Sequence, residues 1–138
     1  MGRILGIDYG DSRIGLAASD PLCITAQPLK VLTVRNGWKN TVPEIHKIVN
    51  DMNIDRIIVG YPLNKNGTRG TRCEVTDRFI EVLAAYLGNV EISRWDERYT
   101  TKQAVSSLGK KNKTKGINDV LSAVLILQSY LDFSGNNK

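Results

Sequence analysis

The chain has 138 residues, of which 41% are hydrophobic, and this length and composition suit one globular domain with a core of its own. It contains no apolar run long enough to cross a membrane, and the short apolar stretch near its start ends at Asp8, so neither a signal peptide nor a membrane span is expected. The formal net charge of +5 favours a polyanionic partner, because lysines and arginines that neutralise phosphates release counterions.

Cysteine usage points to a reducing compartment. Cys23 and Cys73 are the only cysteines, and they lack the spacing of a metal site or a CxxC motif. Reduced thiols are therefore expected, which favours the cytoplasm. We treat residues 1–138 as a single cytoplasmic domain, with a frayed polar tail over residues 133–138.

Apolar segments in the first part of the chain predict three strands. Residues 3–9 are rich in Ile and Leu and end at Gly10, which is typical of a buried strand. Residues 14–18 follow the turn and predict a hairpin with the first strand. Residues 29–34 alternate between apolar and polar side chains, so they predict a third strand.

The rest of the chain alternates between helices and strands. Apolar residues at helical spacing predict helices, and the apolar run before Gly60 is typical of a strand covered on both faces. The predicted elements are, in chain order, a helix over 38–52, a strand over 56–60, a helix over 71–87, a strand over 90–95, a short helix over 100–108 that begins with a capping box, and a last helix over 118–133.

The order of these elements predicts the fold class. Strands separated by helices pair in parallel, whereas the opening hairpin is antiparallel. We therefore predict an α/β fold with a mixed five-stranded sheet flanked by helices on both faces.

Three acidic residues lie where an unpaired charge is costly. Asp8 ends an otherwise apolar strand, Glu97 follows the last predicted strand, and Asp119 shares the apolar side of the last helix. Several carboxylates together suit Mg²⁺ or Mn²⁺, and two such ions can activate water and stabilise the leaving oxygen of a phosphodiester. The three acids therefore predict a metal-dependent site for phosphodiester hydrolysis.

Each acid also has a purely structural interpretation. Asp8 suits a turn between two strands. Glu97 suits a surface ion pair with Arg94 or Arg98. Asp119 suits the first turn of a helix, where an acid complements the helix dipole. Taken singly, no acid decides between the two interpretations.

Basic residues lie beside the acids in the sequence. The loop over 109–116 directly precedes Asp119, and no acid occurs between Arg98 and Asn118. A solvated loop is the plain alternative, but the position next to Asp119 favours substrate contact. The residues predicted to bind nucleic acid are Arg13, Arg98, Lys110, Lys111, Lys113 and Lys115.

The arginines keep alternatives of their own. An ion pair with Asp11 or Asp20 suits Arg13 nearly as well as a phosphate does. Arg98 suits either an orienting contact to Glu97 or a bidentate contact to the scissile phosphate. Arginines 69 and 72, at the 61–70 loop, are a further and weaker candidate pair.

Four motifs, in order along nearly the whole chain, resemble the YqgF (RuvX) family. They are GIDYGDSRIGLAASD at 6–20, VGYPLN at 59–64 with GT at 67–68, DERYTT at 96–101, and Asp119 with AVLILQSYL at 123–131. The resemblance implies a ribonuclease H-like fold and an Asp, Glu, Asp metal site, carried by Asp8, Glu97 and Asp119. The sequence departs from the family pattern at Ser12, where a lysine commonly precedes the arginine, and this puts one phosphate contact in question.

The same resemblance implies a function. The family is associated with the 5′ end of precursor 16S ribosomal RNA, and was earlier associated with Holliday junctions. It therefore implies a metal-dependent nuclease that acts on precursor rRNA. We expect Mg²⁺ or Mn²⁺ as its metal, nucleic acid and no membrane as its partner, and a monomer or a homodimer. Alternatives are a junction resolvase for branched DNA, which normally needs a twofold dimer, and a non-catalytic nucleic-acid-binding factor. A sugar-kinase-like ATPase ranks last.

Overall fold

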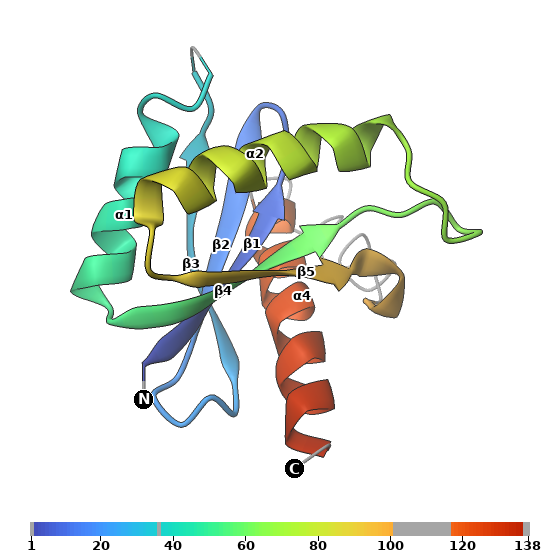
Figure 1. Ribbon diagram of the computed structural model, residues 1–138. Coiled ribbons are helices and arrows are strands. Elements are labelled where there is room, and N and C mark those ends of the chain that lie inside the picture. The colour runs from blue at the N-terminus through green and yellow to red at the C-terminus, as the bar shows by residue number, and fades with distance from the viewer. Residues whose placement is uncertain (1, 36, 101–116, 137–138) are drawn as a thin grey trace.

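The computed structural model describes residues 2–35, 37–100 and 117–136, and these form one five-stranded sheet between helices (Figure 1). The strands are β1 (Arg3–Tyr9), β2 (Arg13–Ser19), β3 (Ala26–Thr33), β4 (Ile54–Tyr61) and β5 (Glu91–Asp96). The helices are α1 (Thr41–Asp51), α2 (Thr71–Leu87) and α4 (Ile117–Asn136), with a 3₁₀ turn η1 (Glu97–Tyr99) after β5. The strand order is β3-β2-β1-β4-β5.

The sheet has the mixed pairing that the sequence predicts. The pairs β1–β2 and β2–β3 are antiparallel, and β4 is parallel to both β1 and β5. Helices α1 and α2 cover one face, and α4 crosses the other (Figure 1). The predicted five-stranded sheet with helices on both faces is confirmed.

Two predicted helix boundaries need comment. Helix α4 continues to Asn136. The predicted frayed tail over residues 133–138 is therefore helical as far as Asn136. The short helix predicted over 100–108 lies, apart from Thr100, outside the described residues. Thr100 itself ends η1, because its hydroxyl donates to the main-chain oxygen of Glu97 at 2.6 Å.

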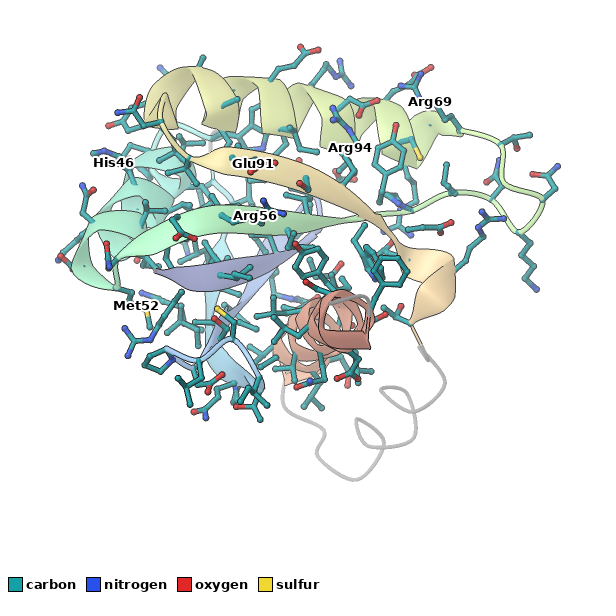
Figure 2. The ribbon with its side chains drawn as sticks, turned by 60° about the horizontal axis from the view of Figure 1, so that its bottom comes forward. His46, Met52, Arg56, Arg69, Glu91 and Arg94 are labelled. Carbon is teal, nitrogen blue, oxygen red and sulfur yellow. The ribbon has the colours of Figure 1, made fainter. Side chains whose placement is uncertain are left out.

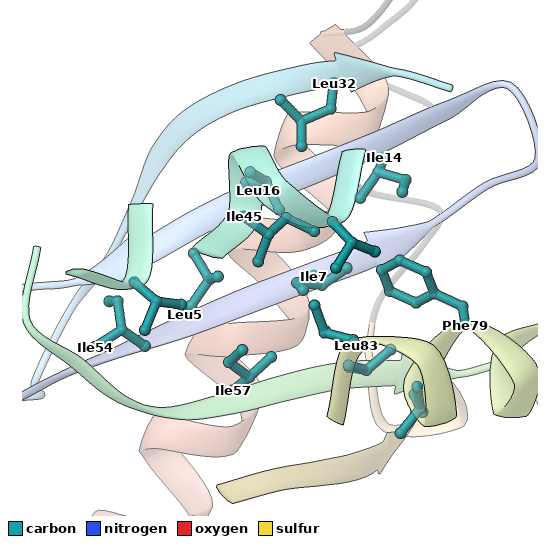
Figure 3. Close-up of a cluster of buried hydrophobic side chains, with 14 residues drawn as sticks. Leu5, Ile7, Ile14, Leu16, Leu32, Ile45, Ile54, Ile57, Phe79 and Leu83 are labelled. Atoms are coloured by element: carbon teal, nitrogen blue, oxygen red, sulfur yellow. The ribbon is translucent and has the colours of Figure 1, made fainter. Parts of the chain in front are cut away.

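The main core fills the space between the sheet and the helices α1 and α2 (Figure 3). Leu5 and Ile7 of β1 are fully buried there against Phe79 of α2. Each such side chain contributes about 1.5–3 kcal/mol of stability relative to an exposed position. Because successive strand residues point to opposite faces, Gly6 and Asp8 lie on the α4 face.

The α4 face has a smaller core, and glycines let the helix approach the sheet closely. A Cβ atom on Gly6 would stand 2.7 Å from the Cβ atom of Leu127, and one on Gly15 would stand 2.0 Å from the main-chain oxygen of Asp119. Helix α4 therefore rests directly on the backbone of β1 and β2. This contact places its first turn over one end of the two strands.

Two further features of the described residues concern the cysteines and possible membrane spans. The thiols of Cys23 and Cys73 are free, with Cys73 fully buried. No helix within the described ranges has the length and apolar character needed to cross a membrane.

Candidate active site

Asp8 lies on the α4 face, one strand away from the first turn of α4. Its partner in the β1–β2 pair is Gly15. Such partners have Cα atoms about 4.5–5.5 Å apart. The backbone of Asp119 packs onto Gly15, with its oxygen 2.0 Å from the position a Cβ would take. The first turn of α4 is therefore held beside Asp8.

Glu97 reaches the same face from the β4 side of β1. The residue is only 7% exposed, and its Oε1 lies 3.0 Å from the position of a Cβ on Gly60. In the parallel β1–β4 pair, Ile7 lies opposite Val59, so Asp8 and Gly60 are neighbours one residue further along. Both lie on the α4 face of the sheet, and Glu97 therefore flanks Asp8.

The structure brings the three predicted acids to one end of one sheet face, from three separate parts of the chain. The side chains do not form a finished metal centre: within residues 2–35, 37–100 and 117–136, no three Asp, Glu, His or Cys side chains are grouped closely enough to hold a metal ion. The donor set itself fits Mg²⁺ or Mn²⁺, because these hard cations prefer carboxylate oxygens. Metal binding at Asp8, Glu97 and Asp119 stays a prediction.

Arg13 forms an ion pair with Asp119. The Nε of Arg13 donates to Oδ2 of Asp119 at 2.8 Å, and the side chains are 44% and 25% exposed. The predicted ion pair of Arg13 with Asp11 or Asp20 is therefore wrong. Asp20 instead accepts a hydrogen bond from the main-chain N–H of Ile24 at 2.7 Å. At this exposure the Arg13 pair contributes at most about 1 kcal/mol, so its main effect is to orient the Asp119 carboxylate.

Arg98 binds Asp96, the residue before Glu97. Its Nη2 and Nε donate to Oδ2 of Asp96 at 2.7 and 2.9 Å, and its Nη1 donates to the main-chain oxygen of Lys65 at 3.4 Å. Asp96 also accepts from the main-chain N–H of Arg98 at 2.9 Å, which caps η1. These contacts hold the turn that carries Glu97. A contact of Arg98 with phosphate stays a prediction.

We expect Asp96→Asn to weaken this turn in a pH-dependent way. Hydrogen bonds from the Arg98 side chain lower the pKa of Asp96 below its ordinary value of 3.8, although burial opposes the shift. A lowered folded-state pKa stabilises the protein above the unfolded-state pKa, and this contribution is lost as the pH falls through the folded-state pKa. The variant should be less stable than the parent by up to about 1 kcal/mol at neutral pH, because asparagine still caps the turn but loses the ion pair with Arg98.

Thermal unfolding followed by circular dichroism measures the effect of Asp96→Asn. The difference in Tm between variant and parent should be largest at neutral pH. It should shrink in acid, where the parent carboxyl becomes protonated and is then as uncharged as the asparagine amide. A difference that is the same at neutral and acidic pH contradicts the proposed role of the charged carboxylate.

The structure describes two of the six residues predicted to contact nucleic acid. Arg13 and Arg98 both lie at the same end of the sheet as the three acids, each paired with an aspartate. The other four, Lys110, Lys111, Lys113 and Lys115, lie outside the described residues.

Gly15 and Gly60 are not among the site residues predicted from the sequence. Both nevertheless affect the positions of the acids, because Asp119 packs against Gly15 and Glu97 against Gly60. A Cβ on Gly60 would stand 2.5 Å from Cδ1 of Ile126 as well as 3.0 Å from Glu97. Glycine inside a strand is a sign of close backbone approach, so the signal was present in the sequence. The partner that approaches each glycine is a long-range contact, and only the structure identifies it.

Comparison with solved structures defines the class of fold. RuvC from Thermus thermophilus, solved in complex with a Holliday junction substrate, superposes with a TM-score of 0.58 over 97% of both chains at 16% identity. A Holliday junction resolvase of fowlpox virus superposes with a TM-score of 0.57 over 96% of this chain and 99% of its own, at 14% identity. The protein therefore has a ribonuclease H-like α/β fold, as predicted.

Sequence comparison then identifies the family. The family model RuvX, described as a Holliday junction resolvase, matches residues 2–133. A relative from Ruminiclostridium cellulolyticum is 49% identical over 99% of this chain and 98% of its own. A relative from Acetivibrio thermocellus is 45% identical over 96% of this chain and 97% of its own, and both are named "Putative pre-16S rRNA nuclease". The chain belongs to the RuvX (YqgF) family.

Proposed function

We propose that this protein is a cytoplasmic metal-dependent nuclease that processes the 5′ end of precursor 16S rRNA. The observation that supports the proposal most is that Asp8, Glu97 and Asp119 all lie at one end of one sheet face. The names of two relatives that match over nearly their full length support the substrate, and the net charge of +5 suits a polyanion.

The carboxylates of Asp8, Glu97 and Asp119 would hold Mg²⁺ or Mn²⁺. When bound, such an ion lowers the pKa of its water and offsets the charge on the leaving oxygen of a phosphodiester. Arg13 orients Asp119 through its 2.8 Å bond. Asp8 has the central role, because its strand lies between β2, which contacts Asp119, and β4, which contacts Glu97.

Metal binding is the first test, because it needs no substrate. A ligand that binds only the folded state stabilises it, by about 2.7 kcal/mol at a hundredfold excess over its Kd. We expect Mg²⁺ or Mn²⁺ to raise the Tm of the parent, EDTA to reverse the rise, and Glu97→Gln to abolish it. Glu44→Gln makes the same change on α1 and should keep the rise. If neither ion changes the Tm of the parent protein, the proposal is contradicted.

The substrate is tested by cleavage. Precursor 16S rRNA, an unrelated single-stranded RNA and a four-way DNA junction are offered side by side with Mg²⁺ or Mn²⁺. We expect metal-dependent cleavage near the 5′ end of the rRNA and little cleavage of the other two. Binding without cleavage of any substrate would instead indicate a non-catalytic nucleic-acid-binding factor.

A junction resolvase is the second candidate function. It is favoured by the description of the family model and by the fold shared with RuvC. Symmetric cutting of both strands requires a twofold dimer, so a monomer in sedimentation under cleavage conditions would contradict this second function. A dimer that cuts the DNA junction faster than the rRNA would replace the first proposal.

A further inference from the structure

A second cluster of charged side chains lies on the other face of the sheet, at the carboxyl end of β4. Tyr61 follows Gly60 and therefore points to the α2 face. Its hydroxyl donates to Oδ2 of Asp77 at 2.9 Å and accepts from Nε of Arg69 at 2.9 Å. Arg94 of β5 donates from Nε to Oδ1 of Asp77 at 2.8 Å. Figure 2 shows Arg69 and Arg94 close to α2, with α4 beyond the opposite face of the sheet.

Asp77 holds the two guanidinium groups in place. Its side chain is 16% exposed and also accepts from Nη2 of Arg69. Burial raises the pKa of Asp77, but hydrogen bonds from Arg94, Tyr61 and Arg69 outweigh it, and the net pKa lies below the ordinary value. The Arg94 guanidinium also lies 5.7 Å from the centre of the Tyr61 ring, within range of a cation–π contact. Both arginines are therefore preorganised.

These contacts leave part of each guanidinium group available to a ligand. Arg94 uses only Nε in its bond to Asp77, and Arg69 uses Nε and Nη2. Arginine has five N–H donors, so donors remain on both side chains, which are 43% and 62% exposed. Two arginines around one aspartate carry a net charge of +1. A guanidinium group can donate two parallel hydrogen bonds to the oxygens of one phosphate. Arg69 and Arg94 are already held side by side by Asp77.

The cluster lines an open hollow of about 610 Å³. Glu74, Arg78 and Glu81 also line the hollow, and together with Asp77 they follow one side of α2 at helical spacing. The hollow therefore presents both guanidinium and carboxylate groups, and its volume lies in the usual range for small-ligand sites. A nucleotide suits this lining, because it carries an anionic phosphate for the guanidinium groups and a base whose edge presents N–H donors to the carboxylates.

We propose that this hollow binds a nucleotide of the substrate strand that flanks the cleaved bond. Its phosphate contacts Arg69 and Arg94, and the edge of its base faces Glu74 and Glu81. This inference rests on the proposed nuclease function and adds to it a binding subsite distinct from the three acids.

The placement of the two sites lets one strand of nucleic acid reach both. Gly60 contacts Glu97 on the α4 face, and the next residue, Tyr61, belongs to the hollow on the α2 face. In the sheet formed by the described residues, β5 is the edge strand beyond β4. A strand that passes around the carboxyl ends of β4 and β5 therefore meets the acids on one face and the arginines on the other.

Binding without cleavage tests the phosphate contact. A fluorescently labelled short single-stranded RNA is titrated in EDTA at several KCl concentrations, with fluorescence anisotropy as the readout. Arg94→Gln and Arg69→Gln should each weaken binding roughly tenfold, because each removes hydrogen bonds to a charged phosphate. Each should also reduce the slope of log K against log[salt] by about 0.7, the value for one phosphate of a single strand.

Matched variants separate a specific contact from a general loss of charge. Lys30→Gln removes one positive charge and one ion pair on β3, at the opposite edge of the sheet, and should change neither affinity nor slope. Arg94→Lys should restore the slope but only part of the affinity, because lysine lacks the planar fork. Equal binding by Arg94→Gln, Arg69→Gln and Lys30→Gln overturns the proposal and leaves the cluster a structural tie between α2 and the sheet.

The proposed contact of the base with Glu74 and Glu81 has its own test. Cytosine presents an amino group where uracil presents a carbonyl oxygen. The parent should therefore bind oligocytidylate more tightly than oligouridylate, and the double variant Glu74→Ala with Glu81→Ala should lose that preference. No preference in the parent overturns this orientation of the base.

Failure of this proposal is distinguishable from failure of the nuclease proposal. The anisotropy measurement contains EDTA, so an absence of metal-dependent cleavage does not alter it. Thermal unfolding of each variant shows whether it folds, and Arg69, as the more exposed arginine, offers the variant with the lower structural cost.

Discussion

Asp8→Asn should abolish metal-dependent cleavage of RNA and leave RNA binding close to that of the parent. Asp8 lies between the strands that contact Asp119 and Glu97, so its carboxylate is the one best placed to share an ion with both. Outer-sphere substitutions at metal sites already cost about 10–100-fold, and loss of a ligand should exceed a hundredfold. Asparagine has nearly the same size, and the fold should be preserved.

The cleavage rate with Mn²⁺ and RNA binding in EDTA together measure the effect of Asp8→Asn. Asp51→Asn is the matched control, because Asp51 is an exposed residue at the end of α1. Its cleavage rate should equal that of the parent. Full activity of Asp8→Asn in the presence of metal would remove the proposed site altogether.

Gly15→Ala should disrupt both stability and activity. The added methyl group would stand 2.0 Å from the main-chain oxygen and 2.4 Å from the carbonyl carbon of Asp119, and both atoms belong to helix backbone that cannot rotate away. Either β2 or the first turn of α4 must therefore shift. Overpacking of this kind costs about 1–3 kcal/mol, and the shift moves Asp119 away from Asp8.

Urea unfolding and the cleavage rate report these two effects of Gly15→Ala. Gly135→Ala is the matched control, because it makes the same change in α4 with no atom within 4 Å of the new Cβ. That variant should be as stable as the parent or more stable by up to about 1 kcal/mol, since alanine favours a helix. If Gly15→Ala matches the parent in both measurements, α4 does not rest on β2 as described.

The sequence by itself determined the strands and long helices that the structure describes, and the mixed pairing of the sheet. Helix α2 spans the predicted residues 71–87, because apolar side chains at helical spacing and Gly88 at its end are local signals. The opening hairpin and the later alternation of strands with helices are local signals as well. Asp8 stood out in the same way, as an acid at the end of an apolar strand.

Only the tertiary structure decided which charged groups meet. Arg13 pairs with Asp119 across 106 residues of sequence, whereas the sequence suggested nearer aspartates. The partners of Arg94 also differ from the sequence-based interpretation, because Arg94 binds Asp77 on α2. Periodicity specifies which face of a strand or helix a residue occupies. Strand register and helix docking decide what that face touches, and these depend on packing between segments far apart in the chain.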